Sequence, residues 1–198
     1  MTELVAVNPK ETSQNALLEV FLTNLRTRRV LKYVKGKSVL DYGCGIHLKT
    51  LRSMEHLISR GCGYDILFKG MDQQTTKENF NVVGDLDDLH GEFDCVTSLA
   101  CFEHIDPAAL PDVLRSLLKI THGGSKIIGT VPRPPARIVL EFLSYRLGLI
   151  DKTQIEDHQV YYDKEQLVET IENTGWHLTT YKTFQFRLNS FFVLERKA

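Results

Sequence analysis

The chain has 198 residues, of which 42% are hydrophobic and 25% charged, so it suits one globular domain with a substantial core. Lys and Arg total 24 against 25 for Asp and Glu, and the net charge of −1 excludes a general electrostatic attraction to nucleic acid. The four cysteines form no C-x-x-C pair, no signal peptide is evident and no metal site is expected, a pattern that favours a reducing cytoplasm.

The first half of the chain predicts helices, then a strand, a glycine turn and another helix. Residues 13–34 have apolar side chains at helical spacing, and residues 39–40 predict a strand buried on both faces. Gly43 and Gly45 then permit positive φ and close backbone approach, and residues 46–60 have helical periodicity. This order predicts a ligand against the turn.

Four more strands are predicted further along, over residues 61–66, 81–84, 93–99 and 125–131. Between the last two, Asp106 and Pro107 predict the N-cap and first position of a helix, which the glycine pair 123–124 would end. Strands and helices thus alternate. Such alternation predicts a parallel sheet with helices on both faces and a ligand crevice at the carboxyl ends of the strands.

The last third changes character at a proline cluster, residues 132–135. A helix is expected over 136–150; its apolar stretch carries charges and is shorter than the roughly 20 residues of a transmembrane helix, so no transmembrane segment is expected. A capping box at 163–166 predicts another helix, and two final strands follow, joined by a tight turn that makes one of them antiparallel. The predicted fold is therefore α/β: a doubly wound, seven-stranded, mostly parallel sheet with one antiparallel strand.

The glycine turn does not fit a dinucleotide-binding fingerprint. That fingerprint, G-x-G-x-x-G, places a third glycine where this chain has Leu48. A pyrophosphate is thus not expected, although a nicotinamide-dependent oxidoreductase remains an alternative with the same alternating fold.

Residues 39–45, Val-Leu-Asp-Tyr-Gly-Cys-Gly, resemble the first motif of class I S-adenosylmethionine-dependent methyltransferases, with His47 where that family has its last glycine. Later blocks resemble the same family in the expected order: the acidic end of the second strand, Gly84-Asp85-Leu86, residues 93–105 ending in Glu-His-Ile, and the glycine turn of 117–125. Residues 140–150 and 157–163 are similar to methyltransferases of bacterial polysaccharide and lipid-linked sugar biosynthesis.

The resemblance implies a Rossmann-like fold and S-adenosylmethionine as the methyl donor, with S-adenosylhomocysteine as the product. Asp41 and the glycine-turn backbone would border the donor's amino-acid end, Asp65 would accept from its ribose hydroxyls, and Asp85 from its adenine amino group. The full set of donor-binding candidates is Asp41, Gly43, Cys44, Gly45, His47, Asp65, Ile66, Asp85, Leu86, Ser98 and Leu99. Asp41 could also cap the helix that follows the turn.

On the acceptor side, positioning should dominate the rate, because the sulfonium is already a good leaving group. If the acceptor is a hydroxyl, His104 and His158 are the candidate general bases. The alternative for His104 is a structural role in capping a helix or orienting a loop. Arg133, Tyr161 and Tyr162 are candidate substrate-binding residues, with a solvated charge and ordinary core aromatics as the alternatives.

The sequence thus predicts a single methyltransferase domain over 1–198 that transfers methyl groups to an oxygen or nitrogen of a small-molecule or glycan-intermediate acceptor. Its parts would be N-terminal helices (1–35), a donor-binding half (36–131), an acceptor-side cover (132–165) and a final helix with two strands (166–198). The alternative is a non-catalytic, donor-binding or regulatory partner with the same fold, which the histidine in place of a glycine suggests. The oligomeric state stays open.

Overall fold

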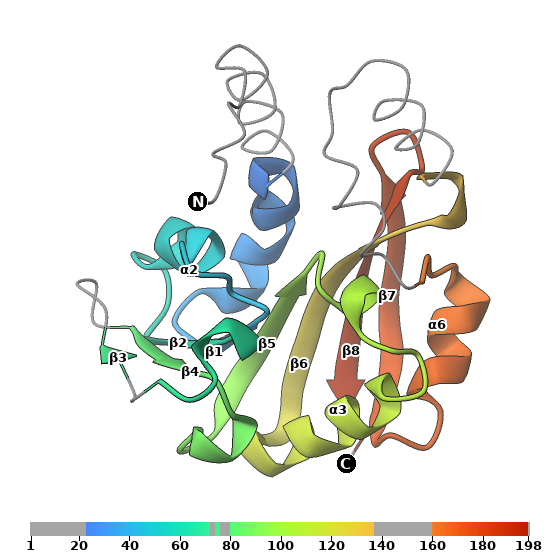
Figure 1. The fold of residues 1–198 in the computed structure, drawn as a ribbon. Helices are drawn as coiled ribbons and strands as arrows, with labels where there is room; N and C mark the ends of the chain where they lie inside the picture. Colours follow the sequence, from blue (N-terminus) through green and yellow to red (C-terminus); the bar gives the residue numbers. More distant parts are fainter. Residues whose placement is uncertain (1–22, 72–73, 76–79, 137–159, 198) are drawn as a thin grey trace, which may run out of the picture.

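The computed structural model describes residues 23–71, 74–75, 80–136 and 160–197. It contains one sheet with the strand order β3-β4-β2-β1-β5-β6-β8-β7 (Figure 1). The strands are β1 (Ser38–Tyr42), β2 (Arg60–Tyr64), β3 (Gln74–Thr75), β4 (Asn81–Val83), β5 (Phe93–Leu99), β6 (Thr121–Pro132), β7 (Trp176–Phe184) and β8 (Asn189–Arg196). The helices include residues 23–34, α2 (Lys49–Met54), α3 (Leu110–Leu117), α6 (Lys164–Ile171) and the 3₁₀ turns η1 (Ile66–Phe68), η2 (Leu86–Asp88), η3 (Phe102–His104) and η4 (Leu118–Ile120).

The strand directions confirm the predicted fold class. Strands β4, β2, β1, β5 and β6 are parallel, and β8 is antiparallel to both β6 and β7. The sequence did not predict β3, which is antiparallel to β4 at the edge, because two residues are too short for an alternating pattern. The carboxyl ends of the five parallel strands consequently meet at one edge of the sheet, the upper edge in Figure 1.

The sheet is covered on both faces, as its apolar strands predicted. Within β1, Val39 packs into one core and Leu40 into the other, because successive side chains point to opposite faces. The first core includes side chains of the helix over 23–34 and of α2, whereas the second includes side chains of α3 and α6. The first helix also contacts β7 through the Arg29 guanidinium, which lies 3.9 Å from the centroid of the Phe184 ring.

The predicted helix over 46–60 is much shorter in the structure. Residues 46–47 form a turn, and Leu48 has a left-handed conformation with φ of 50°, so α2 begins only at Lys49. After Met54 the chain turns again, and its carbonyl accepts the N–H of Leu57. The helical spacing of apolar residues in the sequence therefore continues through the turns on both sides of α2. The residues of these turns fit the pattern but do not belong to the helix.

The start of α3 was also predicted wrongly. The Asp106 carboxylate accepts the N–H of Ala108 and stabilises a turn, while the helix itself begins at Leu110. Pro111, not Pro107, lies in its first turn. A capping pattern of Asp and Pro fits either a turn or a helix, because both use the same side-chain-to-backbone hydrogen bond.

The glycine pair 123–124 does not end this helix. Helix α3 gives way to η4, and β6 already begins at Thr121. The pairing of β5 with β6 shifts between Phe93↔Thr121 and Cys95↔Lys126, so the glycines lie in an irregular start of β6, where Gly124 has φ of 92°. The two glycines thus allow the irregular backbone at the start of β6, where its pairing with β5 shifts register.

The C-terminal predictions agree better with the structure. Asp163 and Gln166 form the predicted capping box at the start of α6. The helix ends at Ile171, ahead of the predicted stop at Gly175, which has φ of 85° at the end of the following turn. Residues 134–136 are helical, but the rest of the predicted helix over 136–150 lies outside the described residues. Among the helices that are described, none combines the length and the apolar character needed to cross a bilayer.

Candidate active site

The turn between β1 and α2 contains an open space. Gly43 and Gly45 both have positive φ, 79° and 62°. A Cβ atom added to Gly43 would lie 2.4 Å from the Sγ of Cys101, so this position must remain a glycine for packing. A Cβ atom at Gly45 would meet no atom of the described residues within 4 Å. The main chain at Gly45 is therefore bordered by room for a ligand.

Asp41 lies at the end of β1 with one carboxylate oxygen unsatisfied. Its side chain is buried, and Thr97 Oγ1 donates a hydrogen bond of 2.6 Å to its Oδ1. Its Oδ2 has no hydrogen-bond partner among the described residues. Burial raises the pKa of Asp41 to about 7, the Thr97 hydrogen bond opposes this, and the charge of Asp65 adds to it. A buried oxygen of this kind suits a cationic or N–H donor from a ligand.

Asp41 does not cap the helix after the turn, contrary to the sequence-based alternative. The residue that precedes α2 is Leu48, and no side chain caps the helix there. Because the Asp41 carboxyl bonds to β5 through Thr97, its second oxygen is left for another partner.

Asp65 follows β2 and is held against the glycine turn. Its Oδ2 accepts the N–H of Gly45 at 2.8 Å, and its Oδ1 accepts the N–H of Leu67 at 3.1 Å, which starts η1. A carboxylate has about four acceptor positions, so Asp65 can still accept two further hydrogen bonds. The sequence placed Asp65 at the correct edge but did not predict its bond to the turn.

Asp85 begins the neighbouring loop after β4. Its exposed carboxylate accepts the N–H of Asp87 at 3.1 Å, which starts η2. A Cβ at Gly84 would lie 2.2 Å from the backbone of residues 68–69, so the Asp85 loop and the Asp65 loop pack directly on each other. Each loop thus presents one carboxylate followed by one apolar residue, Ile66 or Leu86.

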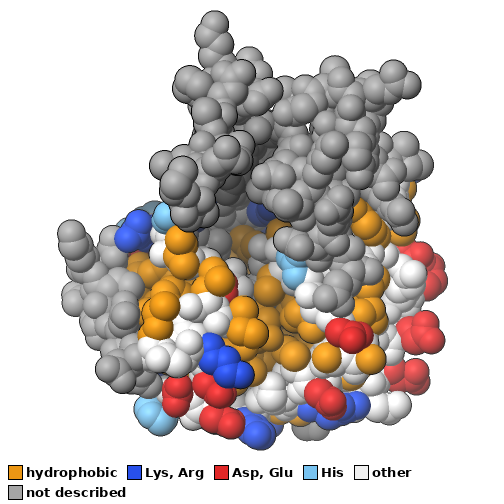
Figure 2. Space-filling view, in the orientation of Figure 1, with side chains coloured by type: hydrophobic (Ala, Val, Ile, Leu, Met, Phe, Trp, Pro, Cys, Tyr) orange, Lys and Arg blue, Asp and Glu red, His pale blue; other side chains and the backbone are white. Residues whose placement is uncertain are grey.

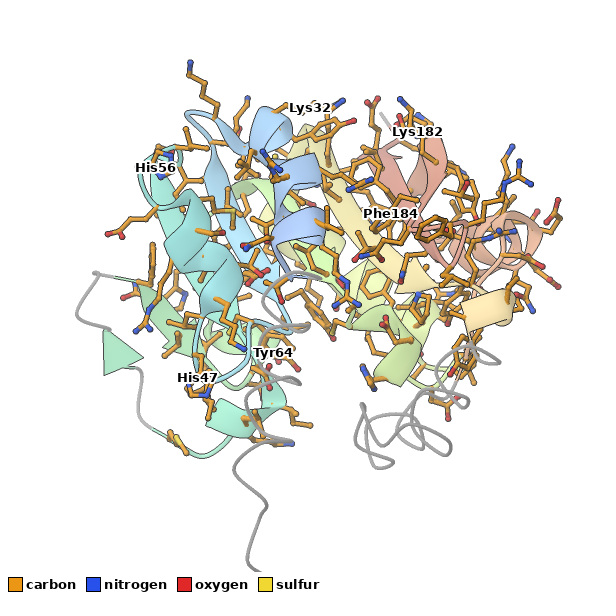
Figure 3. All side chains as sticks on the ribbon, turned by 90° about the horizontal axis from the view of Figure 1, so that it is seen from above. Lys32, His47, His56, Tyr64, Lys182 and Phe184 are labelled. Atoms are coloured by element: carbon orange, nitrogen blue, oxygen red, sulfur yellow. The ribbon has the colours of Figure 1, made fainter. Side chains whose placement is uncertain are left out.

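The remaining donor-side candidates differ in exposure. Ser98 is buried and Leu99 half-buried at the carboxyl end of β5. Cys44 is buried, and its Sγ would lie 2.7 Å from a Cβ at Gly63, so it fills space between the turn and β2. Burial also raises the pKa of the Cys44 thiol, which disfavours a reactive thiolate. His47 is exposed on the turn, and Figure 3 shows it at the same edge of the molecule as Tyr64.

Apolar side chains surround the donor-side loops. The exposed large hydrophobic residues near them are Ile46, Ile66, Leu67 and Met71. Figure 2, in the orientation of Figure 1, shows apolar side chains across the middle of the visible face and acidic side chains mainly at its lower and right edges. Exposed apolar side chains beside the carboxylates of the two loops fit a ligand with a flat apolar ring and polar ends.

The 3₁₀ turn η3 separates three successive side chains into different surroundings. Phe102 packs in the core against Tyr42 and Phe192, with ring centroids 6.3 and 5.8 Å apart. Glu103 is buried, with 1% of its surface exposed, whereas His104 is exposed. Since 3₁₀ residues are about 120° apart, neighbouring side chains must point in different directions. The sequence motif Glu-His pointed to His104 and missed the buried carboxyl beside it.

The predicted substrate-binding residues directly follow β6 or precede α6. Tyr162 is buried, its N–H donates to the Pro132 carbonyl at 3.2 Å, and its hydroxyl has no hydrogen-bond partner in the described part of the chain. Tyr161 is half-buried. Arg133 is half-buried, and its Nη1 donates to the Arg187 carbonyl at 3.1 Å. His158 lies outside the described residues.

The strand order and the site together define a class. A parallel sheet with one reversed strand next to its edge, a glycine turn after β1 and carboxylates after β2 and β4 are the features of a Rossmann-like methyltransferase fold. Residues 16–181 match the profile of a family described as a methyltransferase domain. Because this match covers most of the sequence, the chain belongs to that methyltransferase family. No curated protein matches the sequence.

Solved structures share the fold at low sequence identity. The pyocyanin biosynthetic protein PhzM matches with a TM-score of 0.64 and 14% identity, covering 88% of this chain and 55% of that one. The chain thus spans about half the length of PhzM. The 1,6-didemethyltoxoflavin-N1-methyltransferase of Burkholderia thailandensis matches at 0.60 and 12%, covering 100% and 94%. Magnesium protoporphyrin IX methyltransferase of Synechocystis PCC 6803 matches at 0.56 and 14%, covering 100% and 90%.

Proposed function

We propose that the protein transfers a methyl group from S-adenosylmethionine to an oxygen or nitrogen of a small-molecule or sugar-containing acceptor, releasing S-adenosylhomocysteine. The observation that carries this proposal is the glycine turn after β1, where the Gly45 N–H donates to the Asp65 carboxylate and where Asp41, at the end of β1, keeps an Oδ2 without a partner among the described residues.

The residues at this site fit the proposed donor. The buried Asp41 oxygen suits the donor's ammonium group, which offers N–H donors and a positive charge. Asp65 is held rigidly by two backbone N–H groups and keeps acceptor positions for ribose hydroxyls. Asp85 is exposed on the adjoining loop, where it would accept from the adenine amino group, with Ile66 and Leu86 against the ring.

The bound donor would supply a sulfonium leaving group, so the main task of the chain is positioning. Asp41, Asp65 and Asp85 would hold the amino-acid, ribose and adenine parts of S-adenosylmethionine, and the backbone at Gly45 allows its close approach. A general base would increase the rate roughly 10²- to 10⁴-fold for a hydroxyl acceptor. His104, which is exposed on η3, is the general base predicted from the sequence.

The structural neighbours support the proposal that the donor is S-adenosylmethionine and that the acceptor is a small molecule. The Burkholderia thailandensis structure contains 1,6-didemethyltoxoflavin and S-adenosylhomocysteine, and a Synechocystis structure also contains S-adenosylhomocysteine. Both are small-molecule methyltransferases by name. The sugar-containing acceptor has narrower support, from the resemblance of residues 140–150 and 157–163 alone.

Isothermal titration with S-adenosylhomocysteine tests the proposal. We expect the wild-type protein to bind it and Asp65→Ala to bind at least about tenfold more weakly, because hydrogen bonds to a charged group contribute about 1.5–3 kcal/mol each. Asp112→Ala is the control, since Asp112 is exposed on α3, where it pairs with Arg115 at the surface. No heat of binding from the wild-type protein at millimolar ligand would reject the donor.

The acceptor itself requires a direct search. Incubation with methyl-labelled donor and a panel of phenols, amines and sugar derivatives, followed by mass spectrometry, would identify the methylated product. Products carrying the label only on carbon or sulfur would contradict the proposed acceptor class.

A further inference from the structure

Two buried polar side chains on neighbouring segments, η3 and residues 160–162, each have an atom without a hydrogen-bond partner. They are Glu103 Oε2 and the Tyr162 hydroxyl, neither of which has a partner among residues 23–71, 74–75, 80–136 and 160–197. Buried polar groups are nearly always paired in proteins, so a cluster of exceptions indicates a missing polar ligand.

Backbone contacts place these atoms at one corner of the sheet. Thr130 is the register partner of Leu99 at the end of β5, just before η3. The N–H of Val160 donates to the Glu103 carbonyl at 3.3 Å, and that of Tyr162 donates to the Pro132 carbonyl at 3.2 Å. The segment 160–162 therefore connects η3 to the end of β6, and it brings Tyr162 near enough to Glu103 for that charge to add to the rise in the Tyr162 pKa.

Cys101 links this corner to the glycine turn. Its Sγ lies 2.4 Å from the position that a Cβ atom of Gly43 would take. Burial raises the pKa of the Cys101 thiol, and the charges of Glu103, Asp65 and Asp41 raise it further. Cys101 therefore lies near both Glu103 and the carboxylates of the proposed donor site.

We propose that the Glu103 carboxylate accepts the proton of the acceptor's nucleophile during methyl transfer, and that the Tyr162 hydroxyl holds this nucleophile beside it. The inference rests on the proposed function. The acceptor's O–H or N–H bond breaks and its proton goes to Glu103, a bond forms from that oxygen or nitrogen to the methyl carbon, and the electron pair of the broken S–C bond neutralises the sulfonium. Glu103 afterwards releases the proton to water.

The electrostatic surroundings suit this role. Burial raises the pKa of Glu103 to about 7, opposed by its own backbone N–H and by the charge of Arg26 on the first helix. Burial raises the pKa of Tyr162 to about 12, and Glu103 and Asp106 add to that rise, so Tyr162 remains a hydrogen-bond donor at neutral pH. General bases work best when their pKa is close to the working pH.

A titration that needs no acceptor tests the placement of Glu103. S-adenosylmethionine carries a sulfonium cation that S-adenosylhomocysteine lacks, and all other groups are shared. A cation about 7 Å from a carboxyl group at an effective dielectric constant of about 20 increases its acid dissociation constant by more than about tenfold. Binding of S-adenosylmethionine at pH 7 should therefore release about 0.4 of a proton more than binding of S-adenosylhomocysteine, and the difference should vanish at pH 9.

The experiment is calorimetry of both ligands in buffers of different ionisation enthalpy. Asp41, whose pKa burial also raises to about 7, lies at the proposed donor site and contributes part of the extra proton release. Glu103→Gln should therefore lower the difference in proton release by at least about half and leave the affinity for S-adenosylhomocysteine within about threefold, whereas Glu103→Asp should keep the difference. Glu169→Gln, the same substitution at an exposed position of α6, is the matched control and should behave as wild type. With an acceptor identified, Glu103→Gln should also lower turnover at least about 100-fold and remove the acidic limb of the pH profile near 7.

The outcomes separate the two proposals. If the wild-type protein binds neither ligand, the proposed function fails. If it binds both with equal proton release at pH 7, only the role of Glu103 is overturned, and this result needs no variant. The role is equally overturned if Glu103→Gln keeps the difference, or if His104→Ala alone removes the acidic limb.

Discussion

Alanine at Gly43 should destabilise the fold much more than alanine at Gly45, although both positions have positive φ, 79° and 62°. A left-handed side chain costs roughly 1–2 kcal/mol at either position. At Gly43 alone the new Cβ would also meet Cys101, with Sγ at 2.4 Å and Cβ at 2.8 Å, and overpacking of this kind adds about 1–3 kcal/mol. We therefore expect losses of about 2–5 kcal/mol for Gly43→Ala and about 1–2 kcal/mol for Gly45→Ala.

Urea unfolding followed by far-UV circular dichroism measures the two losses. With a slope of about 2 kcal/mol per M, the Gly43→Ala midpoint should be about 0.5–1.5 M below that of Gly45→Ala. Cys101→Ala removes the nearer contact atom, so combining it with Gly43→Ala should recover at least about 1 kcal/mol in a double-mutant cycle. Equal midpoints for the two glycine variants, or no coupling with Cys101, would refute the close packing described for this turn.

Two further predictions concern the interior. Because burial raises the pKa of Asp41 to about 7, folding favours its protonated form: its contribution to stability is complete below about pH 4 and is lost as the pH rises through 7. The decline of the unfolding free energy between pH 4 and 7 should thus be shallower in Asp41→Asn, by up to about 4 kcal/mol, and identical pH curves from chemical denaturation would contradict this. Trp176 Nε1 donates to the Leu114 carbonyl at 2.8 Å, so Trp176→Phe should cost roughly 1–3 kcal/mol, and a change in unfolding free energy below about 0.5 kcal/mol would show that the bond contributes little.

The sequence predicted the strands more accurately than the helices. Strand β5 has the predicted bounds, residues 93–99. Most of its residues are buried, and a buried run between two turns has few alternatives. The helix over 46–60 was overestimated because buried Leu48 and half-buried Leu57 and Ile58 continue the helical spacing outside the helix itself. Periodicity reports burial, and turns can bury residues as well.

Short polar motifs were ambiguous for a related reason. Asp163 and Gln166 formed the predicted helix cap, but Asp106 closed a turn and the glycines at 123–124 accompanied a strand irregularity. In each case the local hydrogen bond was predictable, whereas the element beside it depended on packing with distant strands.

By itself the sequence determined the order of strands and helices, the glycine turn and the carboxylates that follow neighbouring strands, because these depend on local spacing and chain direction. Only the tertiary structure decided which side chains are buried without partners. It fixed Asp65 to Gly45, brought Cys101 onto Gly43, and buried Glu103 while exposing His104. These relations join residues far apart in the chain or separate adjacent ones in a single tight turn, so they arise from the packing of the whole sheet and not from any local pattern.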